Sequence, residues 1–130
     1  MTGDGDSSSA RDAWIFHIVP RSAWEEAVRV GHYEGDTLET EGFIHASTHE
    51  QLLRVANARF RAAPDLIVVR IVVDRVEPEI VYENTEGGEE LFPHVYGPLR
   101  PGAVDRMAPL VPLADGSFEA TGELAEILRP

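Results

Sequence analysis

The stretch LIVVRIVV, residues 66–73, indicates the fold class of this chain. Seven of its eight residues are apolar, and six of them are β-branched. An almost continuous apolar run of this length is typical of a strand in the interior of a sheet. Shorter strands are expected downstream at EIVYE (79–83), ELFPHVY (90–96) and DRMAPLVPL (105–113). Pro93 and Pro109 favour sheet edges or bulges for the last two, because proline has no N–H to pair.

Two further strands are predicted upstream, and each carries a histidine. WIFHIVP (14–20) is apolar on both faces, so we expect a central strand in which His17 shares a face with Ile15 and Val19. In FIHAS (43–47) the side chains alternate, which puts His45 and Ser47 on one face. A histidine normally avoids a buried strand, so both positions need a physical explanation.

Helices are predicted between these strands. A serine or threonine followed three residues later by Glu or Gln has capping-box spacing, and it occurs at Ser22 and again at Thr48. The first helix is expected over 22–30, ended by Gly31, and the second is terminated by Pro64. Residues 32–41 are expected to form a loop. Strands outnumber helices, and this order predicts an α+β domain with a mixed sheet.

Composition bounds the domain organisation and the partners. The chain has 130 residues, which is the size of one domain, predicted over 13–118, with a disordered tail over 1–12 and a C-terminal tail or short helix over 119–130. It has no cysteine, and its net charge of −12 disfavours nucleic-acid binding. No apolar run approaches the ~18 residues of a membrane span, so we expect a cytoplasmic protein without a membrane partner. The oligomeric state is left open.

The residues that could carry chemistry gather on the predicted strands. His17, His45 and His94 each lie beside apolar residues. Any one of them alone is more often a structural histidine with both nitrogens satisfied. His94 and Tyr96 share a strand face, as do His45 and Ser47, and such pairs suit a cleft. A structural role for each histidine stays open as the alternative.

Several motifs together carry a family resemblance. They are IFHIVPRSAW (15–24), the Trp24 helix ending at Gly31, EGFIHAST (41–48) and LFPHVYGPL (91–99). In combination they resemble the bacterial family called domain of unknown function 952, from about Trp14 to Phe118. The resemblance implies an ADP-ribosyltransferase-like fold, similar to RNA 2′-phosphotransferase, with a largely antiparallel sheet split into two small sheets and two helices packed on them.

The resemblance also implies a site for NAD in a cleft between the two sheets. His17 would hydrogen-bond the ribose or the adjoining amide, and His45 would hold the nicotinamide ribose. Glu83 and His94 compete for the third catalytic position. The residues expected to bind the nucleotide are Ser47, Tyr96, Arg21 and Arg54.

Three functional hypotheses follow from these residues. The first is an ADP-ribosyltransferase-like enzyme that uses NAD or a related nucleotide and acts on a small molecule or a protein. The second is a noncatalytic module that binds a small molecule or a partner protein with the same fold. The third, weaker one is a zinc site built from His17, His45 and His94, since three imidazoles with an open position can hold zinc. We expect no metal.

Overall fold

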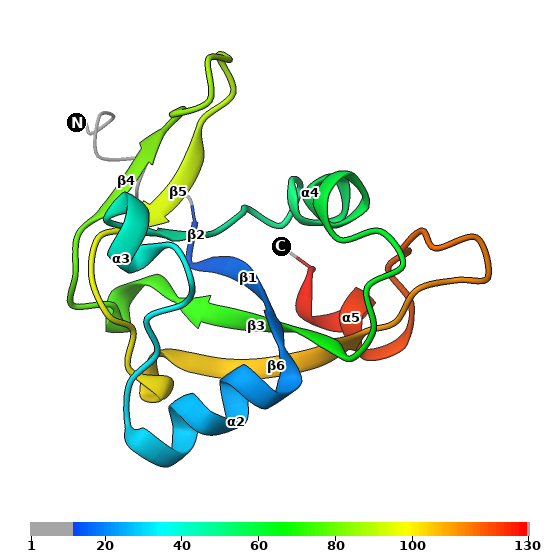
Figure 1. Cartoon of the computed structure of the whole chain (residues 1–130), viewed down its shortest axis with the longest axis horizontal. Coiled ribbons are helices and arrows are strands. Elements are labelled where there is room, and N and C mark those ends of the chain that lie inside the picture. Colours follow the sequence, from blue (N-terminus) through cyan, green and yellow to red (C-terminus); the bar gives the residue numbers. More distant parts are fainter. Residues whose placement is uncertain (1–11, 130) are drawn as a thin grey trace.

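The structure is a computed structural model that describes residues 12–129, and it contains two antiparallel three-stranded sheets (Figure 1). The predicted tail therefore lies outside the described residues, except for Asp12. The first sheet has the order β1-β3-β6, with β1 over Trp14–Pro20, β3 over Leu66–Val72 and β6 over Val104–Leu110. The second has the order β2-β5-β4, with β2 over Ile44–His45, β5 over Phe92–Val95 and β4 over Ile80–Glu83. The α+β class is confirmed, but the predicted mixed sheet is not: every strand pair in the described residues is antiparallel.

Helices cover both faces of the first sheet (Figure 1). Trp24 and Ala27 of α2 (Arg21–Val30) pack on one face, whereas α4 (Leu52–Arg59) and α5 (Gly122–Ile127) pack on the other. The remaining helical segments are α3 (Leu38–Glu41) and the 3-10 turns η1 (Val73–Arg75) and η2 (Pro101–Ala103). In the described part of the chain, no helix combines the length and the apolar character needed to cross a membrane.

β3 is the interior strand that its sequence predicts. It lies between β1 and β6, and its side chains alternate between two cores. Ile67, Val69 and Ile71 join the α2 side, and Leu66 and Val68 join the side of α4 and α5. Burial on both faces explains why this strand is apolar almost throughout.

The predicted central position of β1 is wrong. β1 pairs with β3 alone in the sheet, so it is an edge strand that is apolar because helices cover both of its faces. Its outer edge is partly used by an isolated bridge. Phe16 N–H donates to Ser47 O and Ser47 N–H donates to Phe16 O, both at 2.8 Å. This bridge joins the first sheet to the segment that follows β2.

The position expected for Pro93 is also wrong, whereas the edge expected for Pro109 is confirmed. Pro109 lies in β6, an edge strand, but Pro93 lies in β5, the central strand of the second sheet. Ala46 N–H donates to Pro93 O at 3.0 Å, so Pro93 turns its backbone polar groups toward the β2 side. Regular pairing of β2 stops at His45, and the missing N–H of proline therefore falls where the ladder ends.

Both capping boxes need correction. α2 begins directly after Pro20, whose extended backbone (φ −60°, ψ 140°) caps the helix without a side-chain hydrogen bond, and Ser22 lies inside the helix. Gly31 ends α2 as predicted, with φ 98° and an N–H that donates to Ala27 O. At the second helix, one hydrogen bond of the capping box forms. It is the bond from the backbone of the first residue to the side chain three residues later, in which Gln51 Oε1 accepts the Thr48 N–H at 3.1 Å.

The ends of two segments differ from the expectations, and the C-terminal segment takes one of its two expected forms. α4 ends at Arg59 rather than at Pro64, and Ala62 then takes a left-handed backbone with φ 64°. The last four residues of the predicted loop over 32–41 form the short helix α3. The C-terminal segment is a helix rather than a loose tail, since Ile127 of α5 is fully buried in the second core.

Candidate functional site

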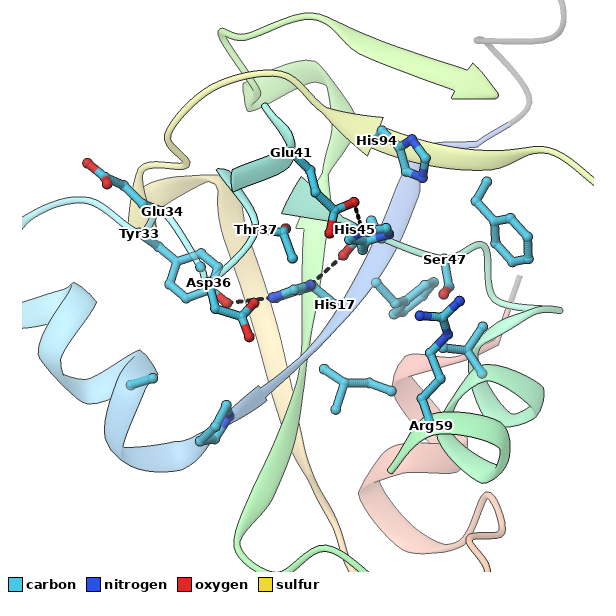
Figure 2. A pocket seen from close by; sticks show the side chains of 18 of the residues that line it. His17, Tyr33, Glu34, Asp36, Thr37, Glu41, His45, Ser47, Arg59 and His94 are labelled. Carbon is cyan, nitrogen blue, oxygen red and sulfur yellow. Dashed lines mark hydrogen bonds and ion pairs between the residues drawn. The ribbon is translucent and has the colours of Figure 1, made fainter. Parts of the chain in front are cut away.

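A cleft of about 1000 Å³ opens where the two sheets meet (Figure 2). Its wall combines β1, the segment of β2 through Ser47, and β5 with the inner side of α2, the loop over 32–37 and the end of α4. This volume suits a small organic ligand. Four sequence-predicted site residues line it, namely His17, His45, Ser47 and His94.

His17 lies in the wall of the cleft with both ring nitrogens engaged. Nδ1 lies 2.5 Å from the backbone oxygen of His45, and Nε2 lies 2.6 Å from the Tyr33 hydroxyl oxygen. A carbonyl oxygen accepts only, which assigns the proton to Nδ1 and makes Tyr33 the donor to Nε2. Burial lowers the pKa of His17 to about 4 and raises the pKa of Tyr33. Both side chains are therefore neutral near pH 7.

Asp36 brings a negative charge to the same end of the cleft. Figure 2 shows its carboxylate beside Tyr33 and His17. Its charge opposes the effect of burial on the pKa of His17 and adds to the effect of burial on the pKa of Tyr33. The next residue, Thr37, donates its hydroxyl to Phe43 O at 2.7 Å, which ties this loop to the segment that enters β2.

His45 and His94 face each other across β2 and β5. They are directly paired in the ladder, and their ring centroids lie 5.0 Å apart. Phe43 stacks on the His94 ring with centroids 4.0 Å apart and planes 11° from parallel. His45 Nε2 lies 3.1 Å from Glu41 Oε1. The two histidines therefore form one aromatic cluster with Phe43 at the cleft.

Glu83 lies behind His94. Its carboxylate accepts hydrogen bonds from His94 Nδ1, at 2.9 Å, and from the Tyr96 hydroxyl. The Tyr96 contact, followed by the His94 contact, lowers the pKa of Glu83, and the same contact raises the pKa of Tyr96. Of Glu83, His94 and Tyr96, only His94 lines the cleft. The two candidates for the third catalytic position are thus hydrogen-bonded to each other.

The two arginines that were expected to bind the nucleotide do not line the cleft. Arg21 pairs with Asp65 at 3.1 Å, and Arg54 makes a two-pronged pair with Glu90 at 2.8 and 2.6 Å. Arg59 lines the cleft instead, in an ion pair with Glu86. Arg59 lies in the last turn of α4, where a basic residue suits the helix dipole, so its sequence position gave no reason to single it out.

Most of the charged side chains that line the cleft are acidic. Within the described residues, one arginine lines it, against the acidic side chains of Glu26, Glu34, Asp36, Glu41 and Glu86. Sequence reasoning missed Tyr33, Asp36 and Glu41 as site residues. Glu41 alone left a signal, because it precedes His45 by four residues, whereas Tyr33 and Asp36 lie in an aperiodic loop.

The described residues give no support to the zinc hypothesis. Within residues 12–129, no group of three or more histidine or acidic side chains has the geometry to hold a metal ion. His17 cannot supply a lone pair without losing a contact, since the His45 carbonyl and the Tyr33 hydroxyl occupy both ring nitrogens.

The fold and the site define a small α+β protein with a histidine-containing cleft between two antiparallel sheets. The chain belongs to the family described as protein of unknown function (DUF952), whose model matches residues 18–107. The family membership expected from the sequence motifs is therefore confirmed. A search of curated proteins gave no match.

Solved structures of the protein CC0527 from Caulobacter crescentus are similar to this chain. The crystal structure is 32% identical, with a TM-score of 0.76, and the match covers 86% of this chain and 98% of that one. The solution NMR structure is 33% identical, with a TM-score of 0.71, and the match covers 81% and 90% of the two chains. These names state no activity, so the ADP-ribosyltransferase likeness stays a prediction.

Proposed function

We propose that this protein is an ADP-ribosyltransferase-like enzyme that binds NAD in the cleft and breaks the bond between nicotinamide and ribose. The observation that carries the proposal is the convergence of His17 and His45 on one cleft from two different sheets. The Phe16–Ser47 bridge and the contact of His17 Nδ1 with His45 O hold the two strands together at this point. Such a fixed wall can orient a ribose, which is the main demand of this reaction.

The charge at one end of the cleft supports cleavage of a glycosidic bond. Loss of nicotinamide leaves an oxocarbenium ion, whose positive charge is stabilised by nearby carboxylates and oriented dipoles. Asp36 and Glu41 line the cleft near His17 and His45 (Figure 2). The Tyr33 hydroxyl donates to His17, so its oxygen lone pairs remain available to a ribose hydroxyl.

Arg59 sets the direction in which NAD would lie. Figure 2 shows Asp36 and Arg59 on opposite sides of His17. The nicotinamide ribose suits the acidic end, and the pyrophosphate suits the guanidinium, which can bind phosphate through two hydrogen bonds. Glu86 already pairs with Arg59, so the phosphate would have to displace this carboxylate.

A noncatalytic binding module is the second candidate, and one observation favours it. Both nitrogens of His17 are satisfied inside the protein. A histidine of this kind can serve the fold alone, by fixing Tyr33 and the His45 backbone. Under this alternative the cleft binds a small molecule, and no bond in that molecule is broken.

Incubation with NAD separates the two candidates. Binding is measured by calorimetry, and free nicotinamide is measured by chromatography over long incubation. The enzyme proposal expects both signals in the wild type and a loss of nicotinamide release in His45→Ala. His49→Ala is the matched control, because His49 is partly exposed and lies outside the cleft lining. Binding without release supports the module, and no binding rejects NAD as the ligand.

A further inference from the structure

We infer that His94 is the general base that activates the acceptor hydroxyl, water included, and that Glu83 and Tyr96 are positioning residues behind it. This inference rests on the proposed function and deepens it, because it assigns the second half of the transfer. We assign the acceptor to the class of hydroxyl compounds, because a hydroxyl is not ionised near pH 7 and needs a general base to become a strong nucleophile.

The hydrogen bonds of His94 leave one nitrogen available. Nδ1 lies 2.9 Å from Glu83 Oε2, and a carboxylate that is ionised accepts only, so the proton of the neutral imidazole belongs on Nδ1. Nε2 has no hydrogen-bond partner within residues 12–129. His94 is 3% exposed and lines the cleft, so the cleft is where a ligand could reach this lone pair.

The ring is held in place from several sides. Phe43 stacks on one face of the imidazole at 4.0 Å, and Glu83 fixes its Nδ1 edge. Tyr96 in turn donates its hydroxyl to the same carboxylate. A base whose orientation is fixed before substrate binds loses little entropy in the reaction. This arrangement resembles a catalytic triad, in which a carboxylate orients a histidine and the histidine accepts the proton of the nucleophile.

The other two histidines fit this role less well. His17 has both nitrogens engaged, by the His45 carbonyl and the Tyr33 hydroxyl. His45 lies on the two-residue edge strand β2, and its side chain is 32% exposed, so water can reach it directly. His94 lies on the central strand β5 and has the more enclosed ring.

The step balances in atoms and charge. The bond between ribose C1′ and the nicotinamide nitrogen breaks, and its electron pair leaves with neutral nicotinamide. The acceptor oxygen forms a bond to C1′ and gives its proton to His94 Nε2. The resulting imidazolium is stabilised by the Glu83 carboxylate and releases its proton to solvent afterwards. With water as the acceptor, the product is ADP-ribose.

The test separates binding from turnover, with NAD as the probe and water as the acceptor. His94→Asn should lower kcat about 10²-fold to 10⁴-fold, the range for loss of a general base, and change the Kd for NAD less than about threefold. Glu83→Gln should lower kcat at least about tenfold, since its amide can donate as well as accept and no longer fixes the proton on Nδ1. Tyr96→Phe should have a smaller effect in the same direction. Glu77→Gln is the control, because Glu77 is an exposed carboxylate paired with Arg100 outside the cleft.

A second measurement keeps the inference testable if NAD is not turned over. Nitrogen NMR of the histidine rings should show a protonated Nδ1 and an unprotonated Nε2 for His94, and Glu83→Gln should change that signature. Diethyl pyrocarbonate, which acylates an accessible unprotonated imidazole nitrogen, should modify His94 in the wild type. A protonated Nε2, a ring that does not react, or wild-type kcat in His94→Asn overturns the inference. Absence of NAD cleavage with the expected NMR signature and reaction overturns the proposed function and the acceptor step that rests on it, whereas the assignment of His94 Nε2 as an available base stands.

Discussion

Phe16 and Ser47 exchange two backbone hydrogen bonds of 2.8 Å, and this bridge connects the two sheets at the wall of the cleft. The bridge places β1 beside the segment that follows β2. As a result His17, one residue after Phe16, reaches the backbone oxygen of His45, two residues before Ser47. The site geometry therefore depends on pairing between two segments about thirty positions apart, in a contact that involves no side chain of either bridge residue.

The first prediction removes one of these hydrogen bonds. Ser47→Pro eliminates the N–H that donates to Phe16 O, and it should destabilise the protein by about 2 kcal/mol or more, because a buried carbonyl loses its partner and the proline ring restricts the backbone. Ser47→Ala keeps both bonds and should cost less than about 1 kcal/mol. Urea denaturation at pH 7 measures both. Equal stability of the two variants would show that the bridge contributes little.

Much of the fold could be predicted from the sequence, where local pattern and burial agree. The apolar sequence of β3 predicts an interior strand, and both of its faces are buried. The glycine at position 31 predicts the end of α2, and it adopts φ 98° there. The neighbours of β1 and β5 could not be predicted. An apolar strand has the same sequence whether its edges are paired or free, provided that helices cover its faces, and β5 accommodates Pro93 because its partner β2 stops one residue away.

The site was predictable in part for a related reason. His17, His45 and His94 lie on strands, and Ser47 lies in an isolated bridge directly after β2. In such extended backbone, alternation fixes the side to which a residue points. Tyr33 and Asp36 lie in the loop between α2 and α3, whose path depends on tertiary contacts such as the backbone pairing of Tyr33 with Leu99. The guanidinium of the cleft is Arg59 rather than Arg21 or Arg54, because the latter two pair with acids outside it.

The second prediction concerns the hydroxyl of Tyr33. Tyr33→Phe keeps the ring, which packs against Trp24 with centroids 5.7 Å apart, but removes the donor to His17 Nε2. The loss should lower the free energy of unfolding by about 1–3 kcal/mol, since a part-buried nitrogen is left without its partner. Thermal and urea denaturation measure this change. An unchanged stability would indicate that water from the cleft replaces the hydroxyl.

The third prediction is a pH dependence of stability that comes from His17. Its folded pKa is about 4, because of burial, while the unfolded value is 6.5. Above pH 6.5 both states are neutral and His17 adds no pH dependence. Between pH 6.5 and 4 the unfolded state binds a proton that the folded state does not, so stability falls by up to about 3 kcal/mol.

Comparison with a variant isolates the His17 contribution from that of the carboxylates, which also titrate near pH 4. The fall between pH 6.5 and 4 should be smaller in His17→Gln than in the wild type, even if the variant is less stable at pH 7. Unfolding curves across this range provide the difference. NMR titration gives an independent check, because the His17 ring should not titrate above about pH 5. Parallel stability curves, or a His17 ring that titrates near 6.5, would contradict the burial argument.

The fourth prediction tests the direction in which a nucleotide lies in the cleft. Arg59→Gln should weaken NAD binding about 10-fold to 100-fold, since a charge-assisted hydrogen bond to phosphate contributes about 1.5–3 kcal/mol. Nicotinamide riboside, which has no phosphate, should bind within about threefold of its wild-type Kd. Glu86→Gln should strengthen NAD binding by a few fold, because it frees Arg59 from its ion-pair partner. Arg54→Gln is the matched control, since Arg54 pairs with Glu90 outside the cleft lining. If Arg59→Gln weakened both ligands equally, the guanidinium would act on the shape of the cleft rather than on phosphate, and the proposed orientation would be wrong.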